Sequence, residues 1–80
     1  RLRLDAAAAE SDEWLIGFGE VEGDSNLSES ADLVEAAARL FDRLHEAQAS
    51  ERPRIAVAQV PKHGIGAAIN DRLRRAAAPR

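Results

Sequence analysis

The pattern of apolar and polar residues along this chain predicts three strands and one brief edge strand. Residues 1–5, Arg-Leu-Arg-Leu-Asp, alternate strictly, which fits a short strand. Residues 14–19, Trp-Leu-Ile-Gly-Phe-Gly, form a continuous apolar run bounded by glycine, as expected of a strand that is covered on both faces. Residues 54–60 alternate β-branched residues with alanine and give the clearest strand pattern. Residues 20–30, which follow the apolar run 14–19, are acidic and polar and form a predicted loop. Within this loop, Asn26-Leu27 fits a brief edge strand.

Spacing of three and four residues between apolar positions predicts two helices. The first begins at Asp32-Leu-Val-Glu35, which has the form of a capping box: the Asp32 side chain accepts from the Glu35 amide while Glu35 reaches back. This helix ends near residues 47–50, before a proline. The second helix runs from about residue 65 to residue 78. The predicted apolar faces are Leu33, Ala37, Leu40, Phe41 and Leu44 in the first helix and Ile65, Ala68, Ile69, Leu73 and Ala76 in the second.

The order of these elements predicts an α/β fold. One strand–helix–strand unit runs from Trp14 to Val60, and its length suits a right-handed crossover between parallel strands. We therefore expect strands 14–18 and 55–60 to be parallel neighbours or near neighbours, joined by the helix over 32–47. The predicted architecture is a small Rossmann-like three-layer module, with a short, mainly parallel sheet flanked by helices.

Length and composition narrow the class of protein further. Eighty residues form one small domain, and 45% of them are hydrophobic. The absence of cysteine excludes disulfides and thiolate metal sites. No apolar run approaches the roughly 18 residues of a membrane span. Because the chain begins with arginine rather than methionine, we expect a fragment or a processed product, with the composition of a soluble, cytoplasmic protein.

The net charge of −3 hides a division of the chain into an acidic and a basic part. Residues 1–51 hold thirteen acids against four bases, a charge of −9, and residues 52–80 hold seven bases against one acid, a charge of +6. This split indicates either an end that faces a polyanion or two faces that complement each other across a domain interface. Arg72, Arg74 and Arg75 are the candidates for that contact, although cations at a helix C-terminus also stabilise the helix without any ligand.

The loop Pro61-Lys-His-Gly-Ile-Gly66 is the candidate ligand site of the sequence. It follows a strand and opens a helix, and Lys62, Gly64 and Gly66 resemble a phosphate cradle, in which glycines free the backbone amides and a lysine adds charge. A dinucleotide fingerprint would require a third glycine where Ile69 stands. The alternative interpretation is a tight strand-to-helix turn, in which a glycine supplies an unusual backbone angle.

Other catalytic chemistry finds no support in the sequence. No paired carboxylates and no nucleophile–base pair can be assembled, so we predict no catalytic residue. His63 lies in the glycine loop, but no second histidine or carboxylate stands at ligand spacing around it. We therefore predict no metal site.

Three stretches together resemble a known family. They are the helix over 32–44, the strand Ile55-Ala-Val-Ala-Gln-Val60 and, above all, Gly64-Ile-Gly-Ala-Ala-Ile-Asn-Asp-Arg-Leu-Arg-Arg-Ala-Ala77. They are similar to the C-terminal accessory domain of the long form of threonylcarbamoyl-AMP synthase, the YrdC/Sua family. The resemblance covers nearly the whole chain, whereas the acidic loop 20–25 and the Lys62-His63 pair are less typical of the family.

The resemblance implies a function for the parent protein. The family makes threonylcarbamoyl-AMP from threonine, bicarbonate and ATP, with magnesium, for the threonylcarbamoyladenosine (t6A) modification of tRNA. Its nucleotidyltransferase chemistry resides in an N-terminal YrdC-like domain that this sequence lacks. The resemblance thus makes residues 1–80 a single C-terminal accessory domain, without activity or cofactor of its own. ATP and magnesium belong to the full-length parent.

Two functions follow as expectations. In the first, the domain packs on its own N-terminal catalytic domain and helps to control closure over ATP and threonine. In the second, residues 61–66 and the arginines of the last helix form a nucleotide- or tRNA-binding module, with direct contact to RNA. The pathway is tRNA modification in the cytoplasm in both cases, without a membrane partner.

Overall fold

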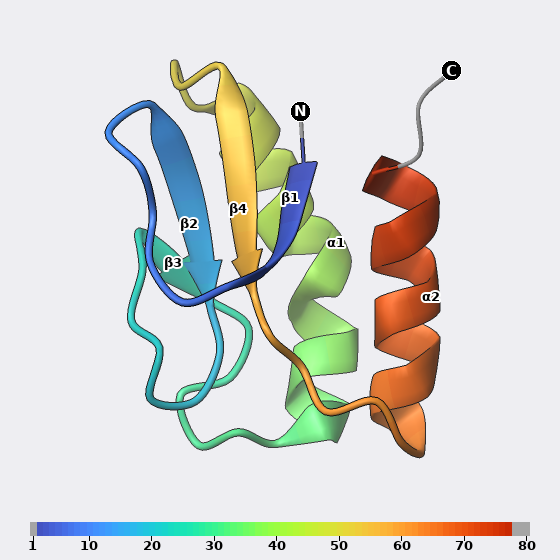
Figure 1. Ribbon diagram of the computed structural model, residues 1–80. Coiled ribbons are helices and arrows are strands. Elements are labelled where there is room, and N and C mark those ends of the chain that lie inside the picture. The colour runs from blue at the N-terminus through green and yellow to red at the C-terminus, as the bar shows by residue number, and fades with distance from the viewer. Residues whose placement is uncertain (1, 78–80) are drawn as a thin grey trace.

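The computed structural model describes residues 2–77 of the chain, which contain four strands and two helices (Figure 1). Arg1 of the first predicted strand and Ala78, the predicted end of the last helix, lie outside the described residues. In chain order the elements are β1 (Leu2–Ala6), β2 (Glu13–Gly17), β3 (Ser25–Asn26), α1 (Leu33–Ala49), β4 (Arg54–Ala58) and α2 (Ile65–Ala77).

The strands form one parallel sheet in the order β1-β4-β2-β3. Ile55 of β4 pairs with Trp14 of β2 on one side and with Leu2 of β1 on the other. The two-residue β3 pairs with the end of β2 and forms one edge of the sheet. The prediction that β2 and β4 are parallel neighbours joined by a helix is therefore confirmed, as are the first strand and the brief edge strand.

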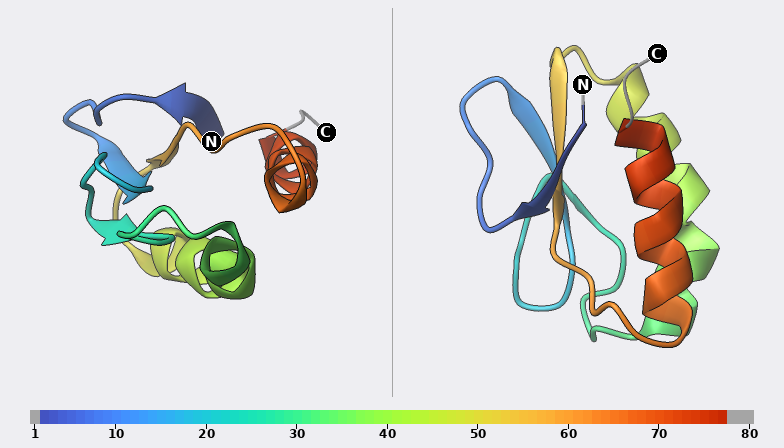
Figure 2. Two further views of the ribbon diagram at one scale, coloured as in Figure 1. Left: turned by 90° about the horizontal axis from the view of Figure 1, so that it is seen from below. Right: turned by 45° about the vertical axis from the view of Figure 1, so that its right-hand side comes forward.

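Both helices lie on the same face of the sheet (Figures 1 and 2). The opposite face carries a second small cluster of Ala6, Leu15 and Ala56, and the extended segments around residues 7–9 and 21–24 lie beside it. The predicted α/β class with a parallel sheet is confirmed. The two helices form a single layer on one face, and loop segments rather than helices lie on the other face, so the expected three-layer arrangement with helices around the sheet is replaced by two layers.

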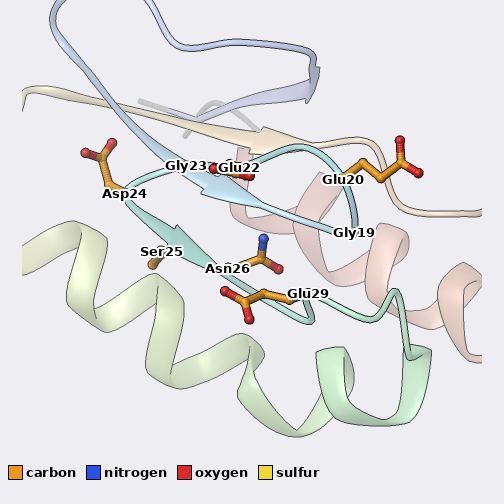
Figure 3. Close-up of a pocket in the computed structure, with 8 residues that line it drawn as sticks. All are labelled: Gly19, Glu20, Glu22, Gly23, Asp24, Ser25, Asn26 and Glu29. Atoms are coloured by element: carbon orange, nitrogen blue, oxygen red, sulfur yellow. The ribbon is translucent and has the colours of Figure 1, made fainter.

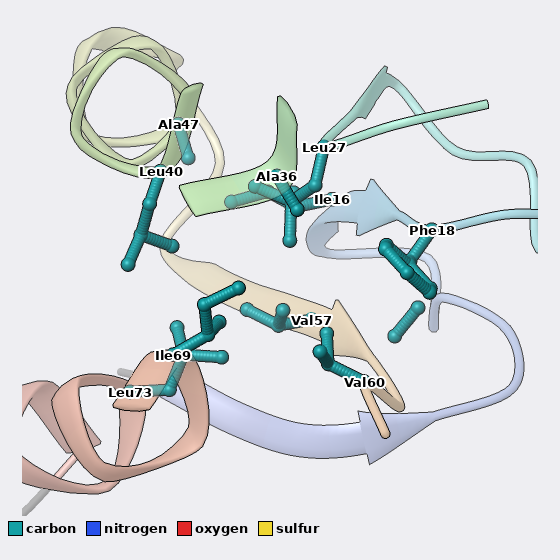
Figure 4. Packing of buried hydrophobic residues seen from close by; sticks show 11 residues of the cluster. Ile16, Phe18, Leu27, Ala36, Leu40, Ala47, Val57, Val60, Ile69 and Leu73 are labelled. Carbon is teal, nitrogen blue, oxygen red and sulfur yellow. The ribbon is translucent and has the colours of Figure 1, made fainter. Parts of the chain in front are cut away.

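The main core lies between the sheet and the helices (Figure 4). Ile16 of β2 and Val57 of β4 are both fully buried at its centre. Leu40 of α1 packs there, and Ile69 and Leu73 bring in α2. Burying such side chains is worth about 1.5–3 kcal/mol each, so this layer is the main source of stability.

The buried faces of the helices differ from the predicted ones. In α1 the buried residues include Ala36 and Ala47, whereas Phe41 is 56% exposed; in α2 Ile65 is 44% exposed. Each helix is apolar over an arc that is wider than one sheet can cover. The sheet contacts the side of α1 with small alanines, which allow close approach, and the larger Phe41 therefore faces solvent. Ala37, Ala68 and Ala76, also predicted to be buried, are exposed.

Candidate functional site

In open parallel sheets, ligands bind at the edge that carries the C-terminal ends of the strands. In this domain the same edge carries the start of α1, the start of α2 and the loops that follow β2, β3 and β4 (Figure 1). Two features at this edge are candidate sites. One is the predicted glycine loop over residues 61–66, and the other is a hollow beside the acidic loop.

Both glycines of the predicted loop have structural reasons to be glycine. Gly64 has φ +56°, in the left-handed region, directly before α2. A Cβ at Gly66 would lie 1.9 Å from the carbonyl oxygen of Pro61, which is closer than any real contact. The tight strand-to-helix turn, one of the two interpretations drawn from the sequence, therefore explains both residues without a ligand.

Asn70 holds this turn together. Its side-chain amide donates to the carbonyl oxygens of Val60, Pro61 and Gly66, at 3.0, 3.3 and 2.8 Å. The residue is 6% exposed, so these bonds join the end of β4 to the first turn of α2 within the protein interior. Sequence reasoning overlooked Asn70, although it lies within the stretch that carries the family resemblance.

Lys62 points its charge at a carboxylate of the domain itself. Its Nζ lies 3.6 Å from Oδ2 of Asp5, which has a positive φ of 56° at the irregular end of β1. An anion at the start of α2 would therefore compete with Asp5 for the lysine. Lys62, Gly64 and Gly66 do lie in one loop, as predicted, and His63 beside them is exposed.

The basic residues of α2 lie away from this loop. Arg72, Arg74 and Arg75 belong to the second half of the helix, two to three turns from Gly64. Arg74 and Arg75 both approach Asp71, at 3.7 and 3.2 Å, whereas the guanidinium of Arg72 lies over the ring of Phe41, with its carbon 4.7 Å from the ring centroid. The structure thus separates the two groups of predicted site residues.

The second candidate is a hollow of about 590 Å³ between the β2–β3 loop and the segment after β3 (Figure 3). Four of its lining residues are acidic, and Glu20 and Asp24 lie at opposite ends of it. Asp24 accepts from the Leu15 amide at 2.9 Å and from Arg52 at 2.8 Å. Within residues 2–77, no three histidine or acidic side chains are grouped so that they could hold a metal ion.

Ser28 closes the neighbouring turn into α1. Asp32 caps the helix as predicted, accepting from the amides of Val34 and Glu35 at 2.9 and 3.2 Å. The return bond differs from a capping box, because the buried Ser28 hydroxyl donates to the Glu35 carboxylate at 2.6 Å and accepts from the Asp32 amide at 2.9 Å. The Ser28 hydroxyl thus connects the Glu35 carboxylate to the Asp32 amide, which were predicted to bond directly.

Ion pairs stabilise the opposite edge of the sheet, where the N-terminal ends of the strands lie. Glu13, 1% exposed, accepts from Nε and Nη2 of Arg3 at 2.9 and 2.8 Å and from the Glu10 amide at 2.8 Å. The pKa of Glu13 is lowered from its ordinary value of 4.5 to about 2. The hydrogen bonds from Arg3 are the largest cause, and the bond from the Glu10 amide is the second largest. The carboxylate therefore remains ionised inside the fold.

Two further arginines join the basic part of the chain to the acidic part at this edge. Arg54 forms a two-bond pair with Asp12 at 2.7 and 2.9 Å, and this hydrogen bonding lowers the pKa of the Asp12 carboxyl. Arg52 binds Asp24 at 2.8 Å and lies over the ring of Trp14. Much of the charge division in the sequence is thus neutralised inside the domain rather than by a partner.

Taken together, these contacts define a small parallel α/β domain whose strand-end loops are closed by its own side chains. By its sequence the chain belongs to the family of the threonylcarbamoyl-AMP synthase C-terminal domain, whose family model matches residues 3–78. This confirms the resemblance that the three stretches indicate. Neither a curated protein nor a solved structure gives a significant match. Within the described residues, no helix is long and apolar enough to cross a membrane.

Proposed function

We propose that the chain is the non-catalytic C-terminal domain of an L-threonylcarbamoyladenylate synthase acting in the t6A modification of tRNA. In this proposal it packs on the catalytic domain of the same protein and helps to control closure over ATP and threonine. ATP and magnesium then bind the catalytic domain, and the adenylate is formed there, in the cytoplasm.

The observation that carries the proposal is the family match over residues 3–78. The contacts of side chains at the strand-end loops support it further. Three polar side chains at these loops bind groups of the domain itself: Asn70 binds three carbonyls, Ser28 binds Glu35, and Lys62 lies beside Asp5. Such groups stabilise the domain. They favour a supporting role over a chemical one.

The test compares pyrophosphate release from ATP, with threonine and bicarbonate, by the full-length synthase, by its catalytic part and by this chain alone. We expect no release by this chain. We expect a several-fold lower kcat/KM for the catalytic part than for the full-length protein, because closure would lose its support. Release by the repurified chain above a buffer control, or equal kcat/KM for the two longer proteins, would contradict the proposal.

The second candidate function, a nucleotide- or tRNA-binding module, draws its support from the helix start behind Gly64, where backbone amides carry partial positive charge. The contact of Lys62 with Asp5 and the distance of Arg72, Arg74 and Arg75 from the loop speak against a single anion site built from all of them. We therefore rank it second.

A further inference from the structure

A shallow groove runs between α1 and α2 and opens to solvent. α1 and α2 pack against each other, and the residues lining the groove between them include Ala37 and Phe41 of α1 and Ile65, Ala68 and Arg72 of α2. A wider hollow of about 540 Å³ continues it toward Arg75 and Ala76. We call this surface the α1–α2 groove.

Of the three exposed large apolar side chains among the described residues, Phe41 and Ile65 line the α1–α2 groove, and Val34 lies outside it on the same face of α1 as Phe41. Val34 is 63% exposed, Phe41 56% and Ile65 44%. Val34 and Phe41 are seven positions apart and so lie on one face of α1, and Ile65 belongs to the neighbouring helix. Apolar side chains gathered on one surface, with polar groups around them, are typical of a protein interaction site.

The charge at the groove is also unbalanced. Arg3, Arg39, Arg43, Arg52 and Arg54 each lie within 4 Å of a carboxylate of the domain, and Arg74 and Arg75 share Asp71. Within residues 2–77, Arg72 is the one arginine for which the structure records no carboxylate partner; its guanidinium rests on Phe41. The surface that covers this groove should therefore bring apolar side chains together with a carboxylate.

We propose that the α1–α2 groove is the surface through which this domain docks on the catalytic domain of the same synthase, with a carboxylate of that domain bound to Arg72. This inference rests on the proposed function and adds the surface and the chemistry of the contact. Arg72 already spans the Phe41 ring, so the guanidinium is held in place and loses little freedom when it binds a carboxylate.

The same arrangement disfavours RNA at this surface. Single-stranded RNA binding uses free aromatic faces on which bases stack, and Arg72 covers a face of Phe41. The residues that line the groove are mostly apolar, and its lining cations are Arg72 and, toward the end of α2, Arg75, which pairs with Asp71. A protein surface therefore fits these observations better than a nucleic acid does.

Hydroxyl-radical footprinting of the full-length synthase tests the proposal, because the chain contains two phenylalanines that serve as mutual references. Phe18 is 7% exposed and Phe41 is 56% exposed in this domain. If the catalytic domain covers the groove, Phe41 is modified almost as slowly as Phe18. Because Arg72 itself covers a face of Phe41, the Arg72→Glu variant of the full-length synthase is compared with the same variant of this chain alone. In the full-length protein the substitution should raise the rate for Phe41 several-fold, to the rate in that isolated variant, and leave the rate for Phe18 unchanged.

Arg74→Glu is the matched control. It makes the same charge change on the same helix, but Arg74 is not among the residues that line the groove. It should leave the rate for Phe41 unchanged. If both variants weaken tRNA binding equally and tRNA alone protects Phe41, the surface binds RNA and the proposal is wrong. Protection that depends on protein concentration would assign the groove to a second copy and would also overturn it.

Failure of this inference is distinguishable from failure of the proposed function. Small-angle scattering of the full-length protein reports whether the two domains pack together at all. If they pack while Phe41 is modified several-fold faster than Phe18, docking uses another surface, and only the inference fails. If the domains move independently, the packing role fails, and this inference fails with it.

Discussion

The two edges of the parallel sheet are closed by different chemistry. At the N-terminal edge, Arg3 and Arg54 bind the carboxylates of Glu13 and Asp12. At the C-terminal edge, the amide of Asn70 and the hydroxyl of Ser28 bond mainly to backbone groups, and Glu35 is the one carboxylate that Ser28 contacts. The first arrangement consists of ion pairs and so depends on ionised carboxylates, whereas the second consists mainly of hydrogen bonds to backbone groups, which depend on a close fit.

This difference bears on the proposed role of the domain as a support, because its sheet is of a type that often binds ligands. The edge at which related architectures receive substrates is occupied by side chains that tie loops to helices. The edge that carries strong charges has its charges matched within the domain. Among the described residues, the arginine for which the structure records no carboxylate partner is Arg72, which lies on α2 over the ring of Phe41 and away from both edges.

The largest effect should come from Gly66→Ala at the C-terminal edge. The added Cβ meets the Pro61 carbonyl, which is backbone, so the connection between β4 and α2 must move. We expect a loss of about 3 kcal/mol or more in the free energy of unfolding, which is a large part of the stability of a small domain. Chemical denaturation followed by the fluorescence of Trp14 measures it.

Gly64→Ala is the control for that variant. Nothing lies within 4 Å of the added Cβ, so only the left-handed backbone opposes it, at a cost of about 1–2 kcal/mol. Gly64→Asn should cost less, because asparagine adopts this conformation more readily. Equal losses for Gly66→Ala and Gly64→Ala would mean that the close approach to Pro61 does not govern the turn.

Asn70→Asp should have the next largest effect on the free energy of unfolding. In this variant we expect stability to change with pH in the direction opposite to that of the wild type. A carboxylate cannot donate to the three carbonyls, so at neutral pH we expect a loss of about 2–4 kcal/mol, larger than for Asn70→Ala. Protonation restores a donor, and burial among acceptors raises the pKa of the new carboxyl. Stability should therefore partly recover as the pH falls. A variant that loses stability on acidification as the wild type does would contradict this account of the turn.

A moderate effect is expected at the N-terminal edge when the wild type is acidified. The pKa of Glu13 is about 2 in the fold and 4.5 ordinarily, so its contribution is fully present above about pH 5 and is lost as the pH falls toward 2. Denaturation midpoints between pH 6 and pH 2 should fall steeply for the wild type and less steeply for Glu13→Gln. Glu51→Gln, at an exposed position, is the control and should keep the steep fall.

Local pattern was sufficient to predict the strands and the cap at Asp32, because these depend on neighbours in sequence. The parallel pairing of β2 with β4 was predictable from the order of the elements and the length of the connection between them. The choice of buried helix face was not predictable in this way. Ala36 and Phe41 both lie on the apolar arc of α1, and only the position of the sheet decides which of them is buried.

The polar contacts that define both edges depend on tertiary structure. The pair of Arg52 with Asp24 joins residues 28 apart, and it forms because β2 and β4 are neighbours in the sheet. Asn70 reaches Val60 only after α2 has folded back from the end of β4. The sequence placed the glycine loop correctly, but the partner of Lys62 could not be inferred without the position of β1.

The smallest effect is expected when a nucleotide is added to the chain. The amides at the start of α2 carry partial positive charge, and Lys62 adds a full charge only if it leaves Asp5. Such weak attraction is screened by salt. We expect the amide resonances of residues 62–68 to shift slightly and linearly with ATP or GTP, and the shifts to disappear at moderate salt. Lys62→Ala should reduce them further. A saturable, salt-resistant response confined to residues 62–68 would show that the C-terminal edge binds nucleotide after all, and the contrast between the two edges would then be one between a structural edge and a binding edge.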